Sequence, residues 1–238
     1  QATALVGVLD SFMESKGLLT PEAWRRFCAP QVLLARFPRY TYTAGEEVPV
    51  EVWVYSFGAG DLAGEGAVAL EAGGKTLARA AFSGSFAAGS LTCAGSFRLP
   101  TAGLSQAGPV RLCLSLAGVE NDYTLYVYPP AGLGLPQGVL LAQGYTPDVA
   151  QALQDGKTVV LATSAARPER SVAGFFASDF WCYPMFRGIA ERKGVPPAPG
   201  TLGLLIDAGH PALSAFPTGA ASDWQWQPIA YHGRTLLL

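Results

Sequence analysis

The chain has 238 residues, half of them hydrophobic and 14% charged, which is typical of one large or two small globular domains. Its net charge is −2, from 16 basic and 18 acidic residues spread along the chain. Basic residues do not gather into the stripe that is typical of a nucleic-acid-binding surface. No stretch approaches the roughly 20 apolar residues of a membrane helix, so we expect neither nucleic acid nor membrane among its partners.

Residues 1–30 contain one clear helix start. Thr20 is a favourable N-cap, Pro21 suits the first helical position, and Glu22 complements the helix dipole. These residues predict a short helix from Pro21 to about Cys28. The beginning of the chain does not resemble a signal peptide, and the compartment, cytoplasmic or secreted, stays open.

From residue 31 to about residue 130 the hydrophobic pattern has a period of two. In the segment Val48–Tyr55, valines alternate with more polar or larger residues, which predicts a half-buried strand. Five further strands are expected at Ala67–Leu70, Thr76–Phe82, Leu91–Leu99, Val110–Leu116 and Tyr123–Tyr128. Short strands separated by Gly-rich turns predict an immunoglobulin-like β-sandwich over residues 31–130.

A Pro- and Gly-rich linker at 129–136 leads into a different pattern. A strand at Gly138–Ala142, a helix capped by Thr146 and a strand at Thr158–Thr163 form a βαβ unit, which implies a parallel sheet. Further strands are expected at Thr201–Ile206 and Arg234–Leu238. Residues 131–238 are therefore predicted to be a small α/β domain with a partly parallel sheet, flavodoxin- or amidotransferase-like. Because its last residues are an apolar run, we expect a truncated fragment.

The four cysteines are Cys28, Cys93, Cys113 and Cys182, and none has the CxxC spacing of a zinc ribbon or thioredoxin-type motif. Two interpretations remain open. Cys93 and Cys113 could form a disulfide across the sandwich, or all four could be buried thiols that pack as small apolar side chains.

Catalytic motifs are missing from the sequence. There is no GxSxG nucleophile elbow, no HxxxH metal pair and no phosphate-binding glycine loop. We therefore expect no catalytic residue, no metal and no cofactor. The alternative is a small amidotransferase-like enzyme that uses Cys182 and His210, although His210 precedes Pro211 at a helix start, which favours a capping role.

Aromatic residues beside Asp and Gln form the most distinctive segments, at 175–181 and 222–227. Aromatic faces stack on sugar rings and polar side chains bind sugar hydroxyls, but the same aromatics could pack in a core. The candidate carbohydrate contacts are Asp179, Trp181, His210, Asp223, Trp224 and Trp226.

The first segments of the chain resemble the end of the catalytic barrel of glycoside hydrolase family 2, the β-galactosidase and β-glucuronidase relatives. The segments concerned are Thr3–Asp10, Phe12–Gly17 and Pro21–Phe27, with Pro30–Phe37 as the first part of the sandwich. Asn121–Pro129 resembles the last strand of that sandwich in a bacterial subgroup. The segments at 178–181, 200–203, 209–213 and 216–226 resemble an additional α/β domain there.

The resemblance implies that residues 1–30 are the tail of a barrel or a linker helix. The chain would then be a bacterial, non-catalytic accessory region that supports a barrel and could contact carbohydrate. The glutamate pair of that family is absent, so no catalytic residue is carried over. The expected partners are the barrel of the parent chain, carbohydrate and a second copy of the chain. The other alternative is a purely structural oligomerisation module.

Overall fold

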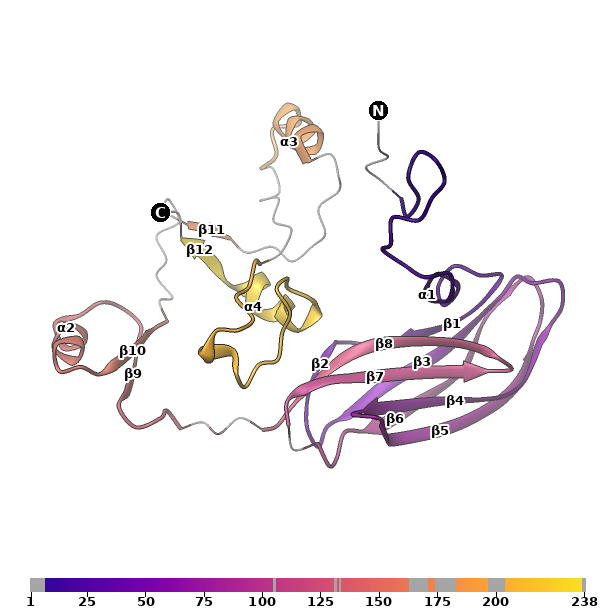
Figure 1. Cartoon of the computed structure of the whole chain (residues 1–238), viewed down its shortest axis with the longest axis horizontal. Coiled ribbons are helices and arrows are strands. Elements are labelled where there is room, and N and C mark those ends of the chain that lie inside the picture. The colour runs from indigo at the N-terminus through magenta and orange to yellow at the C-terminus, as the bar shows by residue number, and fades with distance from the viewer. Residues whose placement is uncertain are drawn as a thin grey trace. The chain divides into compact units, whose positions relative to one another are not determined.

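The computed structural model describes residues 7–104, 106–130, 132, 134–162, 171–173, 183–196 and 204–236 (Figure 1). The chain divides into two units. The first contains residues 1–130 and 208–218, and the second contains residues 131–207 and 219–238.

The first unit contains two β-sheets (Figure 1). The three-stranded sheet has the order β1-β3-β6 and the five-stranded sheet has the order β2-β8-β7-β4-β5. Only the β2–β8 pair is parallel among these strand pairs. The strands are β1 Gln31–Arg36, β2 Thr41–Thr43, β3 Glu47–Ser56, β4 Leu62–Ala72, β5 Lys75–Phe86, β6 Ser90–Pro100, β7 Gly108–Leu116 and β8 Val119–Tyr128.

The core lies between the two sheets and confirms the alternation read in the sequence. Val48, Val50, Val52 and Val54 of β3 are all buried, and they join one cluster with inward residues of the five-stranded sheet such as Leu112. Burying alternate side chains of two facing sheets is how a sandwich forms its core. The β-rich, sandwich-like prediction is therefore confirmed.

Residues 7–30 precede the sandwich and contain α1 (Pro21–Arg25). The Thr20 hydroxyl accepts a hydrogen bond from the Ala23 N–H at 3.2 Å, so the predicted cap is confirmed. The helix is shorter than predicted, because the chain turns after Arg25 and reaches β1 through Pro30. Residues 208–218 belong to the same unit, where the Phe216 ring stacks on Tyr128 with centroids 5.2 Å apart.

The second unit contains the predicted βαβ segment. Strand β9 (Val139–Ala142) pairs in parallel with β10 (Thr158–Leu161), and α2 (Pro147–Gln154) connects them. Its cap is Thr146, whose hydroxyl accepts from the Val149 N–H at 3.4 Å.

The larger flavodoxin-like sheet is not shown. Within the described ranges, β9 and β10 form a sheet of two strands. Leu205 makes an isolated antiparallel bridge to Ala221, and β12 (Arg234–Leu236) pairs antiparallel with β11 (Ser171–Ala173). Within the predicted strands at 201–206 and 234–238, Leu205 and residues 234–236 thus have antiparallel partners. A local apolar run does not specify which strand it pairs with. The unit also contains α3 (Tyr183–Arg192), the short helix η3 (Trp224–Trp226) and α4 (Gln227–His232).

Both interpretations of the cysteines need correction. Cys93 and Cys113 are free thiols on the outward faces of different sheets, so they point away from each other and cannot form a bridge. Cys28 and Cys93 are exposed, so these two are not buried thiols either. Cys182 lies outside the described residues.

Candidate interaction site

Residues 7–30, called the arm below, begin with a hydrogen-bonded loop. Leu9 and Ser15 form an antiparallel bridge, and the Asp10 N–H donates to the Glu14 carbonyl at 2.9 Å. One carboxylate oxygen of Asp10 accepts hydrogen bonds from the backbone N–H groups of Phe12 and Glu14 at 2.8 and 2.9 Å. An Asp side chain that binds the backbone ahead of it stabilises a tight turn. The loop therefore has a defined conformation.

The tip of this loop presents two large apolar side chains to solvent. Phe12 is 78% exposed and Met13 is 75% exposed. Met13 also has a φ of +66°, in the left-handed region that residues other than glycine seldom occupy. Backbone strain of this kind costs on the order of 1–3 kcal/mol and is concentrated at functional sites. The loop thus keeps a methionine where glycine would fit with less strain.

The helical part of the arm extends the apolar surface. Trp24 and Phe27 contact each other edge to face, with ring centroids 5.2 Å apart, yet Phe27 remains 54% exposed. The large hydrophobic residues of the arm that are exposed are Leu9, Phe12, Met13, Leu18, Leu19, Trp24 and Phe27. Single exposed apolar residues are ordinary, but a concentration of them marks an interaction surface.

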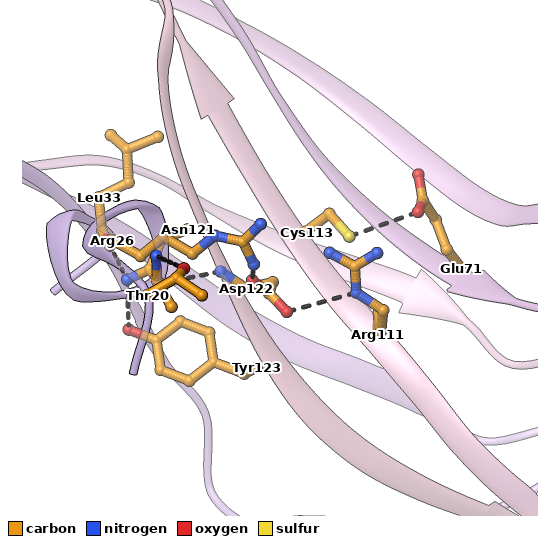
Figure 2. Close-up of polar contacts among 10 residues, drawn as sticks. Thr20, Arg26, Leu33, Glu71, Arg111, Cys113, Asn121, Asp122 and Tyr123 are labelled. Atoms are coloured by element: carbon orange, nitrogen blue, oxygen red, sulfur yellow. Dashed lines mark hydrogen bonds and ion pairs between the residues drawn. The ribbon is translucent and has the colours of Figure 1, made fainter. Parts of the chain in front are cut away.

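An ion-pair cluster joins the arm to the sandwich (Figure 2). The Arg26 guanidinium contacts one carboxylate oxygen of Asp122 on β8, and the Arg111 Nε on β7 donates to the other oxygen at 3.3 Å. Asp122 thus binds two arginines from segments far apart in the sequence. The Asp122 side chain is only 21% exposed, so this carboxylate is more shielded than those of ordinary surface pairs.

Beside this cluster, small side chains on the outward face of the five-stranded sheet form the floor of a hollow of about 270 Å³. Strand register places Ala69, Cys113 and Asp122 in one row across β4, β7 and β8. Figure 2 shows the Cys113 thiol pointing toward Glu71, to which it donates at 3.5 Å. Burial, which is the largest cause, and this carboxylate both raise the pKa of the Cys113 thiol, whereas Arg111 opposes them.

Beneath the cluster, β8 is joined to β1 through side chains. The buried Asn121 amide donates to the Leu33 carbonyl at 2.7 Å, and its oxygen accepts from the Asp122 N–H at 2.8 Å. The Tyr123 hydroxyl accepts from the Ala35 N–H at 3.2 Å. These bonds satisfy backbone groups at the edge of β1, so the anchor of the arm rests on a firmly connected part of the sandwich.

Of the residues predicted to contact carbohydrate, four lie within the described ranges. His210 caps the short helix η2 (Pro211–Leu213), where its Nδ1 accepts from the Ala212 N–H at 3.1 Å. Asp223 likewise caps η3 by accepting from the Gln225 N–H at 3.3 Å. Trp224 is 49% exposed, and Trp226 is partly buried. Asp179 and Trp181 lie outside the described residues.

The sequence analysis missed the arm as a functional feature. Its signal was present as Phe12 and Met13 between the polar residues Asp10 and Glu14. The residues were assigned instead to a barrel tail, in which such side chains would be buried. In the part of the chain described by the structure, no three His, Cys, Asp or Glu side chains gather as a metal site would require. No described helix has both the length and the apolar character of a membrane span.

Comparisons with known proteins match the two parts of the chain separately. A model described as a domain of unknown function (DUF8488) matches residues 46–129, and another (DUF8487) matches residues 140–238. No curated protein matches the sequence. Among solved structures, the chain is similar to Spo0M, a sporulation control protein from Bacillus subtilis, with 17% identity and a TM-score of 0.32. That match covers 44% of this chain and about half (51%) of the Spo0M chain.

The resemblance to glycoside hydrolase family 2 is therefore wrong. The matched models are two domains of unknown function, and none of the comparisons points to a glycosidase or to carbohydrate metabolism. Among the described residues, the segments that carried the resemblance include strand, turn and helix-start residues. Such residues recur in unrelated sandwiches because the same packing rules select them.

Proposed function

We propose that this chain is a non-catalytic interaction module that docks on a folded protein domain through its arm. The observation that carries this proposal is the exposure of Phe12 and Met13 at the tip of a hydrogen-bonded loop. A pre-formed loop loses little conformational entropy on binding, so its two apolar side chains can contribute most of their burial free energy to the complex.

The charges around the tip favour a protein partner over a lipid surface. Asp10 and Glu14 flank the two apolar residues, and Lys16 is the nearest basic residue in the loop. A loop that enters an anionic membrane combines apolar residues with several basic ones. Acidic residues beside Phe12 and Met13 instead suit an apolar pocket with a basic or neutral rim.

Support for a non-catalytic role comes from two groups that could have done chemistry. The Cys113 thiol donates to Glu71 and has a raised pKa, which opposes formation of the nucleophilic thiolate. His210 uses its Nδ1 in a helix cap. The amidotransferase-like alternative needs Cys182 near the other nitrogen of His210, and it stays an alternative.

A photo-crosslinking experiment tests the proposal. Phe12 is replaced by p-benzoylphenylalanine in cells that produce the protein naturally, and Tyr145, which is 70% exposed, is replaced in the same way as the control. We expect one crosslinked protein of defined mass at position 12 and none at position 145. Crosslinks to many proteins at both positions, or to none at either, would contradict the proposal.

Two variants then test binding between this protein and the purified crosslinked partner. Met13→Gly removes the side chain and relieves the positive φ, so the loop should be retained or become more stable while partner affinity falls at least tenfold. Leu153→Ser, at a 49% exposed position of α2, should leave affinity unchanged. Equal affinity of Met13→Gly and the unmodified protein would remove the loop tip from the interface. Binding to anionic vesicles that depends on Phe12 would assign the tip to membranes instead.

Sugar contact is a second proposal, supported by the half-exposed Trp224 beside Asp223. Indole faces stack on sugar rings in carbohydrate sites, and the Asp223 cap holds the backbone of this segment. Calorimetric titration of the protein with neutral and acidic monosaccharides, repeated with Trp224→Ala, tests this proposal. No heat of binding with either protein would end it.

The finer description of the fold is part of the same proposal. We infer that the sandwich is of the immunoglobulin-like type and that the β9–α2–β10 segment belongs to a larger α/β domain. The mostly antiparallel strand order of the two sheets and the parallel β9–β10 pair support these two assignments. An experimental structure of the whole chain would test both.

A further inference from the structure

One side of the sandwich is formed by β5 and β6, two long strands whose outer edges pair with no other described strand. In the sheet orders, β5 is the last strand of the five-stranded sheet and β6 is the last strand of the three-stranded sheet. Over the described residues, no backbone hydrogen bond joins the outer edge of either strand to another segment. Each edge therefore presents a row of backbone groups that can pair with a further strand.

Apolar side chains on this side are only partly covered. Core-facing Ala78, Ala80 and Phe82 of β5 pack against the buried cluster but stay partly exposed, as does Phe97 of β6. The Phe82 and Phe97 rings lie with centroids 5.9 Å apart, across the opening between the sheets. An added strand would cover these side chains and bury further apolar surface.

The middle of β5, residues 78–84, has few of the features that usually protect an edge strand. The whole strand contains no proline, and its charged residues are Lys75 at its first position and Arg79. Natural proteins discourage pairing with lysines, prolines and inward charges at such edges. Beyond Lys75 and the register shift at Leu77, the stretch 78–84 is accordingly a pairing surface.

We propose that a second copy of this chain pairs with it antiparallel through β5, joining two five-stranded sheets into one continuous sheet. A strand that pairs with its own copy about a two-fold axis must place residues of the same face opposite each other. In a regular strand, the residues of one face have numbers that are either all even or all odd. The numbers of two opposed residues therefore add to an even sum. The sum 162 pairs seven residues, 78–84, on the regular side of the register shift at Leu77, and places Ala81 opposite the same residue of the copy, with Arg79 opposite Ser83.

This register is compatible with both faces of the strand. On the outward face, small residues oppose each other or Arg79, so the two arginines do not face each other. On the core face, Ala80 lies opposite Phe82, which pairs a small with a large side chain. Self-complementarity of this kind favours a second copy over an unrelated strand as the occupant.

Charge substitutions at Ala81 test the pairing. Ala81 is exposed on the outward face, so Ala81→Lys and Ala81→Glu should fold as the unmodified protein does. By light scattering coupled to gel filtration, we expect a dimer for the unmodified chain and monomers for each variant, because like charges then face each other. An equimolar mixture of the two variants should form the dimer again. Thr124→Lys, on the outward face of β8, is the matched control and should leave the dimer intact.

The outcomes separate this inference from the proposed function. A monomeric unmodified chain at concentrations up to about 100 µM, well above the Kd of a stable dimer, would overturn the proposal. So would a dimer that survives Ala81→Lys. The proposal is independent of the arm, so a dimer unaffected by Met13→Gly agrees with it. Loss of the dimer in Met13→Gly would instead assign self-association to the loop tip.

Discussion

On the side where β1 meets β8, side chains join the two sheets, whereas on the side of β5 and β6 each sheet ends on a strand whose outer edge is unpaired among the described residues. At the first side, Asn121 and Tyr123 of β8 bind the Leu33 carbonyl and the Ala35 N–H of β1. At the second side, Phe82 and Phe97 lie across the opening without hydrogen bonds between the strands. One side of the sandwich is thus held together by hydrogen bonds between its own strands, whereas on the other side the strand edges can pair with a further strand.

Of the substitutions on the β1–β8 side, Asn121→Ala should lower the free energy of unfolding most. The Asn121 side chain is buried, and its removal leaves both the Leu33 carbonyl and the Asp122 N–H without their partner. Leaving buried polar groups unpaired costs roughly 1–3 kcal/mol, so the free energy of unfolding should fall by about 2–3 kcal/mol. Urea denaturation measures this. Thr124→Ala, exposed on the same strand, should change it by less than about 0.5 kcal/mol, and a similar loss in both would contradict the role of Asn121.

Tyr123→Phe should weaken the same side by a smaller amount. The substitution removes only the hydroxyl that accepts from the Ala35 N–H, while the ring keeps its edge-to-face contact with Phe37 at 5.6 Å. A neutral hydrogen bond contributes about 1 kcal/mol, which is the expected loss of stability by urea denaturation. Hydrogen exchange of the Ala35 amide should accelerate in parallel. Unchanged exchange would show that this amide has another acceptor.

Asp122→Asn should loosen the arm more than it destabilises the sandwich. Arg26 and Arg111 are 41% and 52% exposed, so the loss of their shared carboxylate should cost less than about 1 kcal/mol. Trypsin cleavage after Arg25 and Arg26 should nevertheless become faster, because α1 loses its anchor. Equal cleavage rates before and after the substitution would show that other contacts hold the arm.

The smallest expected effect is the pH dependence of stability that comes from the Cys113 thiol. Burial raises its pKa in the folded protein, so folding favours the protonated thiol. This contribution to stability is present below the ordinary thiol pKa and is lost as pH rises through the raised value. Alkylation followed by mass spectrometry should therefore modify Cys113 after the exposed Cys28 and Cys93. Modification of Cys113 first would contradict the raised pKa.

Local signals in the sequence were sufficient for many elements of the fold. The alternating valines of β3, the capping threonines Thr20 and Thr146, and the strand–helix–strand pattern at 138–161 all predicted structure that is present. Each of these signals acts over a few residues, through burial of one face or a hydrogen bond to the next turn. The capping preference of His210 was visible in the same way.

The candidate site could not be predicted to the same extent. Sequence reasoning located no function in Phe12 and Met13, because a run of apolar residues does not reveal whether a partner, a core or solvent meets it. A false family resemblance then assigned these residues to a barrel. A bridge between Cys93 and Cys113 likewise stayed open as one of two interpretations, since their spacing does not specify on which face of each sheet they lie.

Local sequence patterns were enough to predict strands β3 to β8 of the sandwich, the starts of α1 and α2, and the side chains that alternate toward the core. Only the tertiary structure decided that Asp122 binds both Arg26 and Arg111 and that Asn121 reaches Leu33, 88 residues earlier. It also decided which strand edges stay unpaired. The physical reason is that local patterns follow from contacts a few residues apart. The partners of a strand and of a charged side chain follow from how two sheets bury their faces together.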